Sequence, residues 1–170
     1  MPYPTTVDSG QTPPWIITSE AAVLSSTSST LATNTVYLFA FELFANISIS
    51  GVRIRVGSTA TGTTDLGIYD VNGNKLVSTG AVSNSSNTTM TNNFSSNYAL
   101  APGKYFLAMC VSNNTDTLQR LSGVANMAPA TRFRLANNNG SSGVLPSTTG
   151  GTTSTTICPM MAGIVVGGLG

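Results

Sequence analysis

Histidine is absent from this 170-residue sequence, and only 8% of the residues are charged. Without an imidazole the chain cannot assemble a Ser-His-Asp or Cys-His nucleophile, and zinc lacks one of its usual ligands. The six carboxylates are dispersed, and the two nearest in sequence, Asp65 and Asp70, would face opposite sides of a strand. A glycosidase requires two carboxylates that face each other across a cleft. We therefore expect no enzyme, no cofactor and no metal site.

Charge of either sign is too sparse to attract a polyanion. The seven Lys and Arg residues are scattered, and the formal net charge is +1, which leaves no basic patch for phosphate backbones or anionic lipids. Apolar runs such as 36–44 and 164–166 are far shorter than the roughly 20 residues of a membrane span. The sequence does not open with a basic region followed by an apolar one. We expect no nucleic-acid partner, no membrane and synthesis in a cytosol.

Cysteine is scarce, with single residues at positions 110 and 158. Cys110 lies in an apolar run and Cys158 precedes a proline, so the two could form a disulfide or remain two buried thiols. We favour two buried thiols.

In place of charge the chain carries 21 Ser, 25 Thr and 15 Asn residues, beside an apolar fraction of 41% that suffices for a core. Residues 36–44 are aromatic and branched and predict a strand covered on both faces. In residues 47–56 the apolar positions change phase at Gly51, which predicts a bulge at Ser50-Gly51. Glu42 lies within the first of these strands, and we expect it to pair with an arginine or to lie at a subunit contact.

The remaining patterns also indicate strands and turns. Asn72-Gly73 predicts a tight hairpin whose positive backbone dihedrals these two residues supply. The polar stretch 84–97 suggests a weak strand with loops on either side, and residues 137–156 predict a long loop. Further strands are expected at 65–71, 75–78, 104–111, 131–135 and 163–166. No sustained helical period occurs, so the fold class is all-β: a jelly-roll-like antiparallel sandwich of about eight strands.

Residues 1–33 predict an extended N-terminal arm ahead of a sandwich domain at 34–170. Prolines, a glycine and a Ser/Thr run interrupt this segment and argue against helical or ladder structure. A tryptophan on a restricted, extended segment can dock into a pocket of another subunit, or it can pack on its own domain. The candidate partner-binding residues of the arm are Pro13, Pro14, Trp15, Ile16 and Ile17.

Sugar binding is the one ligand chemistry that the composition leaves open. Amide and hydroxyl side chains on sandwich loops can hydrogen-bond a saccharide while an aromatic ring stacks against it. Aromatic residues are few in the expected loops, so the pattern lacks a clustered aromatic platform. The candidate ligand-loop residues are Tyr98, Asn137, Asn138 and Asn139.

Three stretches carry a series of core and turn residues. They are Thr35–Phe39 continuing through Ile47–Val52, Asp65–Asp70 with the letters LGIYD, and Leu100–Ala108 with APGKYFLA. The series resembles the small jelly-roll-type β-sandwich module of structural proteins of tailed bacteriophages, in heads and in tail or fibre proteins. The resemblance covers about residues 34–112. It implies a fold and a virion setting, and it carries no catalytic residue across.

Within a virion, a capsid decoration (cement) protein bound to the major capsid protein is the preferred hypothesis. The chain has a short arm and lacks the long shaft of a receptor-binding fibre. Three-fold symmetry is common in virion spikes, so we expect a homotrimer. The alternative is a tail-tip or fibre module that recognises a host surface glycan. A cellular adhesin or lectin domain is disfavoured because no secretion signal is visible.

Overall fold

The computed structural model describes residues 16–18, 26–121 and 132–166. Every strand pairing in these ranges is antiparallel, which confirms the predicted all-β sandwich. No helix in the same ranges is long and apolar enough to cross a membrane. The strands are β1 (Ile16–Thr18), β2 (Ser26–Thr30), β3 (Val36–Leu43), β4 (Ile47–Arg55), β5 (Thr63–Asp70), β6 (Lys75–Ser78), β7 (Val82–Ser83), β8 (Thr89–Leu100), β9 (Gly103–Val111), β10 (Thr117–Leu121), β11 (Phe133–Ala136), β12 (Thr152–Ser154), β13 (Cys158–Pro159) and β14 (Met161–Val165).

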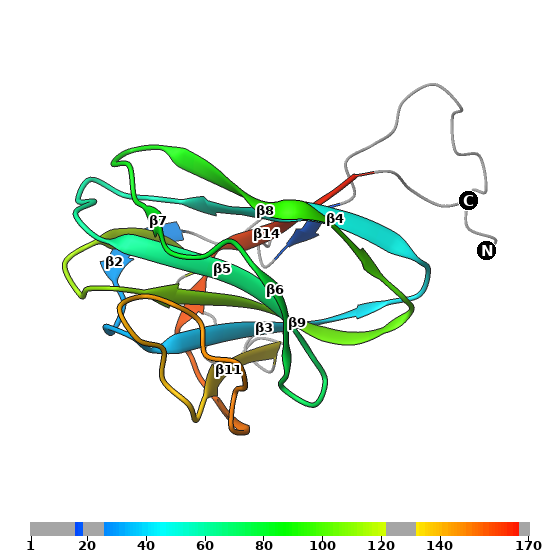
Figure 1. The fold of residues 1–170 in the computed structure, drawn as a ribbon. Coiled ribbons are helices and arrows are strands. Elements are labelled where there is room, and N and C mark those ends of the chain that lie inside the picture. The colour runs from blue at the N-terminus through cyan, green and yellow to red at the C-terminus, as the bar shows by residue number, and fades with distance from the viewer. Residues whose placement is uncertain (1–15, 19–25, 122–131, 167–170) are drawn as a thin grey trace, which may run out of the picture.

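The connections follow a jelly roll, in which the chain passes back and forth between two layers. One layer is a seven-stranded sheet in the order β12-β11-β3-β9-β5-β6, with β7 paired to β5. The other contains a four-stranded sheet, β1-β14-β4-β8, and a three-stranded sheet, β13-β10-β2. In a jelly roll β4 and β10 would be neighbours, and here a bridge between Val56 and Leu118 joins them at one point. Elsewhere β14, paired with β4, and β13, paired with β10, lie between these two strands. Figure 1 shows the two layers stacked.

The space between the layers holds the main core. Side chains that alternate along β3, β5 and β9 point inward and meet those of β4 and β8. Phe39 and Phe133 pack with ring centroids 5.1 Å apart and planes tilted by 46°. Leu66, Ile68 and Leu107 are fully buried, and burying each side chain stabilises the fold by about 1.5–3 kcal/mol.

A second, smaller core lies on the outer face of the seven-stranded sheet. Residues 137–151, here called the strap, run over this face and bury Val36, Leu38, Tyr69 and Cys110 together with Leu145 of the strap itself. This explains why β3 and β9 are apolar on both faces. The sequence predicts that the strand at 36–44 is covered on both faces, and within one chain the strap covers part of the second face.

Polar contacts hold the strap on the sheet. The Tyr69 hydroxyl donates to the Pro146 carbonyl at 2.5 Å, and Lys75 Nζ donates to the Leu145 carbonyl at 2.7 Å. The Leu145 amide donates to Asp65 Oδ2 at 2.9 Å. Asp65 is fully buried, and burial raises the pKa of its carboxyl although the Leu145 amide and Lys75 favour the charged form.

The prediction that residues 1–33 form no ladder structure is wrong at two places. β1 pairs with β14, with Ile16 opposite Ile164, and β2 pairs with β10 over five residues. The sequence of β2, STSST, has no apolar residue and so gives no strand signal of its own. It forms a strand because β10 pairs with it. Both strands thus belong to the sheets of the sandwich.

The strand predicted within 84–97 is confirmed but is longer than expected, because β8 (Thr89–Leu100) is the longest strand in the described ranges, with 12 residues. Its inward positions include Asn92 and Phe94, which are buried, while the intervening polar residues are exposed. Polar residues on the outer face masked the alternation.

The sequence predicts two features that depend on glycine, a bulge at Gly51 and a hairpin at Gly73, and the structure contains both. The register of β4 against β8 shifts between Ile49 and Gly51, which confirms the bulge, and a Cβ at Gly51 would overlap the Asn92 carbonyl oxygen. The hairpin at Asn72-Gly73 is confirmed, but only Gly73 has a positive φ, 82°. The Gly73 amide donates to the Asp70 carbonyl at 3.0 Å, so the loop has three residues instead of two.

The structure also places Glu42 and the two cysteines. Glu42 is exposed and lies opposite Lys104, not an arginine, in the β3–β9 register, which does not support the expected arginine pairing; its alternative place at a subunit contact stays a prediction. Cys110 and Cys158 are both buried and free, as favoured from the sequence. Burial raises the pKa of the Cys110 thiol to about 12 and that of Cys158 to about 11.

Candidate functional site

The strap covers only part of the outer face of the seven-stranded sheet, and the uncovered part forms a pocket of about 240 Å³. Four strands or their ends contribute to it. The pocket lies where β3 ends and β9 begins, beside the β5–β6 turn and the residue that precedes β11. Its lining residues are Ala40, Phe41, Glu42, Val71, Lys104, Tyr105, Phe106 and Arg132.

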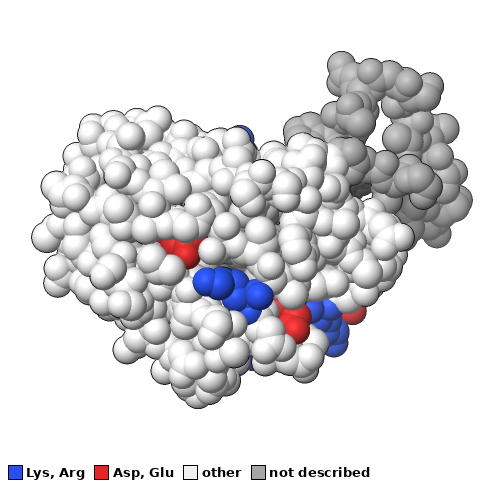
Figure 2. Space-filling view, in the orientation of Figure 1, with Lys and Arg blue, Asp and Glu red and all other residues white. Residues whose placement is uncertain are grey.

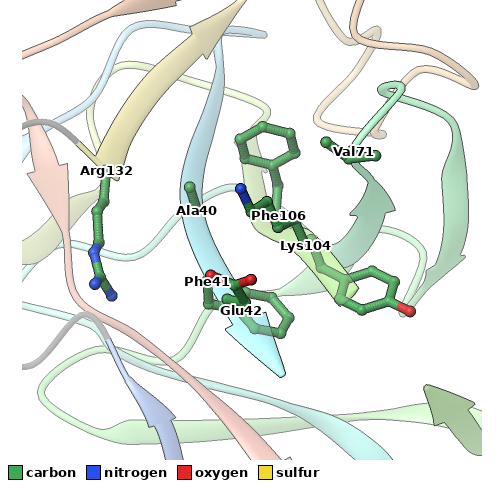
Figure 3. A pocket seen from close by; sticks show the side chains of 8 residues that line it. Ala40, Phe41, Glu42, Val71, Lys104, Phe106 and Arg132 are labelled. Atoms are coloured by element: carbon green, nitrogen blue, oxygen red, sulfur yellow. The ribbon is translucent and has the colours of Figure 1, made fainter. Parts of the chain in front are cut away.

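Strand register explains how these side chains come together. Ala40 lies opposite Phe106, and Glu42 lies opposite Lys104, so alternate residues of β3 and β9 share the outer face. In Figure 3, Arg132 and Val71 lie on opposite sides of Ala40 and Phe106. The result is an apolar floor with charged groups around it.

The side chains at the floor of the pocket are less exposed to solvent than those at its rim. Ala40 and Phe106 are half-buried, whereas Glu42, Lys104 and Arg132 are exposed. Val71 is 59% exposed, which is unusual for a large apolar side chain. Two cations and one carboxylate give the rim a net positive charge, so the pocket suits a ligand that combines an apolar face with an anionic group.

The pocket combines an apolar floor with charged residues at its rim, which are features of a binding site. No group of three or more His, Cys, Asp or Glu side chains that could hold a metal ion occurs in the described ranges. Figure 2 shows that the charged side chains on the viewed face gather mostly in one short band of an otherwise uncharged surface. Many of the exposed residues in the described ranges are Ser, Thr or Asn, so hydroxyl and amide groups are available to a partner.

Asp116 forms a separate polar centre that joins three loops. Only 2% of this residue is exposed. Its Oδ1 accepts hydrogen bonds from the Thr61 amide at 2.6 Å and the Gly62 amide at 3.1 Å, and its Oδ2 accepts one from Asn84 Nδ2 at 2.6 Å. Burial opposes ionisation, but the bonds from Thr61, Asn84 and Gly62 outweigh it and lower the pKa of Asp116. The donors satisfy the carboxylate from inside the protein, which makes it a structural group.

The residues predicted as a ligand loop do not meet in one place. Tyr98 is half-buried in β8, opposite Ile49, and packs against the main core. Asn137, Asn138 and Asn139 are exposed at the start of the strap, after β11. Figure 1 places β8 and β11 at opposite margins of the sandwich.

Two of the strap asparagines have a structural role. Asn137 Nδ2 donates to the Gly150 carbonyl at 3.1 Å, and Asn138 Nδ2 donates to the Thr148 carbonyl at 3.1 Å. These bonds tie the beginning of the strap to its end, so the amides are already used within the chain.

The structure describes only the candidate arm residues from position 16 onward. Pro13, Pro14 and Trp15 lie outside the described residues. The backbones of Ile16 and Ile17 belong to β1 and pair with β14, which fixes where the preceding chain joins the four-stranded sheet.

Sequence reasoning missed the pocket. Its lining residues come from 40–42, 71, 104–106 and 132, and none of these short groups forms a motif. The available signal was a pair of outward-facing charges, Glu42 and Lys104, at the ends of two otherwise apolar strands. Comparison with known proteins adds no assignment, because no family model and no curated protein matches the chain.

Proposed function

We propose that the protein is a non-enzymatic virion structural protein that decorates the outer surface of a capsid and stabilises it. The observation that carries this proposal is the surface, which has few charges and many hydroxyl and amide groups on a sandwich scaffold. Such a surface forms hydrogen-bonded contacts that depend little on salt. The jelly-roll connections are in keeping with the resemblance to phage structural modules.

The mechanism is passive. A protein that binds across several capsid subunits stabilises the assembled shell, because it binds the shell and not its separated parts. Contacts with more than one subunit strengthen one another through their high effective concentration. The partner is the major capsid protein, and the decorating unit is a homotrimer.

Residues 1–15 are the proposed capsid-binding segment. They join the sandwich at β1, on the edge of the four-stranded sheet, and they include Trp15, Pro13 and Pro14. A tryptophan gives a large contact area with few rotatable bonds, which makes it an effective anchor in an interface.

The experiment is co-sedimentation of the purified chain with phage heads that lack their decoration protein. We expect the full chain to bind at both low and high salt, and a variant without residues 1–15 to remain folded by circular dichroism but to lose binding. The Trp15→Ala variant should weaken binding at least tenfold, whereas Phe44→Ala, which changes an exposed aromatic residue of the sandwich, serves as a matched control. Undiminished binding by the truncated variant would refute the role of this segment.

The pocket favours a second candidate function, recognition of a host surface glycan by a tail-tip or fibre module. Phe106 offers an apolar face for a sugar ring, and Lys104 and Arg132 can bind an acidic substituent. Glycan binding by the isolated chain that is lost in Lys104→Ala but retained in Arg55→Ala, an exposed cation on the other sheet, would support this function. No binding to acidic glycans would dismiss it.

A further inference from the structure

β8 forms a long outer edge of the four-stranded sheet. It pairs with β4 on one side, and within the described ranges no strand pairs with its other side. The other edges are short or covered: β1 and β12 have three residues each, and the amide of Lys75 in β6 donates to the Ser147 carbonyl at 2.9 Å. An open strand edge is a template for pairing with another chain.

The composition of β8 leaves that edge unprotected. Its 12 residues, TMTNNFSSNYAL, contain no charged residue, no proline and no glycine. Natural proteins usually block exposed edges with charged residues such as lysine, with proline or with a bulge. Of these devices β8 has only the irregularity in its register against β4, which follows Asn93, and the alternation of inward and outward side chains is regular from Thr89 to Ser95.

Asn92 lies in the middle of this regular segment and is only 5% exposed. Its Nδ2 is buried and has no hydrogen-bond partner. A buried amide without a partner is costly, and native proteins rarely leave one. The other buried side-chain atoms without a partner in the described ranges, Thr64 Oγ1 and Asn84 Oδ1, do not lie on a sheet edge.

We infer that β8 pairs antiparallel with β8 of a second copy of this chain, with the two-fold axis at Asn92. Directly opposite residues in an antiparallel pair share a face, so this axis places Asn92 beside the partner's Asn92. Each amide group has a donor and an acceptor, and the two can form a reciprocal pair of hydrogen bonds. Because Nδ2 is buried in the single chain, this pair requires the Asn92 side chain to turn toward the strand edge, where the partner's amide gives Nδ2 the acceptor that it lacks.

The same register matches the neighbouring positions. Met90 faces the partner's Phe94 on the inward side, where both are apolar. Thr91 faces the partner's Asn93 on the outward side, where both are polar, and Thr89 faces the partner's Ser95. Because the segment is uncharged, the two copies do not repel each other. Axes at Thr91 or Asn93 would place Asn92 opposite Met90 or Phe94 and leave its amide without a partner.

A two-fold contact closes on itself as a pair, and it is therefore separate from any three-fold contact. It does not depend on the capsid proposal. Sedimentation of the full chain should give twice the mass of a variant in which β8 is blocked, whether the blocked species is a monomer or a trimer.

The blocking variant is Thr91→Glu with Asn93→Glu. Arg53 lies opposite Thr91 within the chain, so a glutamate at position 91 has a favourable neighbour in the folded protein. In the pair, however, each introduced glutamate would face a glutamate of the partner. We expect the mass to fall by half and the folding transition to persist. Thr152→Glu with Thr153→Glu, which adds the same charge on β12, should keep the paired mass.

The register has its own test. Asn92→Cys should form an intermolecular disulfide under mild oxidation, because the two residues are opposite each other, whereas Met90→Cys should not. Cys110 and Cys158 are buried and do not interfere. Equal masses for the full chain and the blocked variant would overturn the inference, and crosslinking through Met90→Cys but not Asn92→Cys would overturn the register.

Discussion

Asp116 provides a quantitative test of how the loops of this sandwich are held together. Its carboxylate accepts hydrogen bonds from the Thr61 amide, the Thr61 hydroxyl, the Gly62 amide and Asn84 Nδ2. It thereby connects the loops that follow β4, β7 and β9. Asp116→Ala would remove the acceptor of these donors, of which Gly62 and Asn84 are half-buried and Thr61 is exposed.

The expected loss is large for a single substitution. A hydrogen bond to a charged group contributes about 1.5–3 kcal/mol, and bonds that share one carboxylate are not additive. Removing the acceptor leaves neutral, partly buried donors unsatisfied, which costs about 1–3 kcal/mol, so we expect Asp116→Ala to lower the free energy of unfolding by about 3 kcal/mol. In a chain of this length that corresponds to a fall in Tm of about 6–12 °C.

Asp116→Asn keeps one oxygen and should lose less, about 1.5–2 kcal/mol. Its effect should depend on pH. The folded-state pKa of Asp116 is lowered, so the carboxylate stabilises the fold above its unfolded pKa near 3.8. This contribution is lost as the pH falls through the folded pKa, and the difference between the wild type and Asp116→Asn should shrink there.

The assay is urea denaturation followed by circular dichroism at neutral and acidic pH. Asp70→Asn is the matched control, because Asp70 also has a lowered pKa but binds only its own turn, and it should lose no more than about 1 kcal/mol. An Asp116→Ala protein within about 1 kcal/mol of the wild type would refute the reasoning.

Three further predictions concern the strap, the β5–β6 hairpin and the thiols. Burial raises the folded-state pKa of Asp65, so its contribution is fully present below the unfolded pKa and is lost as the pH rises through the folded value; the stability difference in urea denaturation should therefore shift in favour of Asp65→Asn from acidic to neutral pH, and a difference that does not change with pH would contradict this. Gly73→Ala should lower the free energy of unfolding by about 2 kcal/mol, because the residue has a φ of 82° and the new Cβ would overlap Thr149 Oγ1; an unchanged Tm would show that the hairpin adapts. Cys110 and Cys158 should resist iodoacetamide at pH 8 in the folded protein and react fully in denaturant, since burial raises the pKa of both; rapid labelling of the folded protein would contradict their burial.

The sequence predicted the elements whose residues act locally. The bulge at Gly51 follows from a change of phase in the apolar pattern, and the hairpin at Gly73 follows from a residue that tolerates positive φ. The turn type was less accessible, because whether Asn72 adopts a positive φ depends on loop length. The sandwich itself could be predicted from β-period patterns alone.

The elements that the sequence did not predict depend on partners far away in the chain. β2 contains only Ser and Thr, and it becomes a strand because β10 pairs with it. β8 is polar on its outer face, so its inward residues give only a weak strand pattern in the sequence. The strap has the composition of a plain polar loop, yet Leu145 buries itself against Tyr69 on β5. The pocket unites residues as distant as Ala40 and Arg132.

Imaging tests the central claim, capsid decoration, most directly. The purified protein would be added to phage heads that are otherwise complete but lack their decoration protein, and the particles would be examined by cryo-electron microscopy. The account predicts added density on the outer capsid lattice at three-fold or quasi-three-fold positions. Bare capsids, with density on tails alone or on no part of the particle, would contradict it.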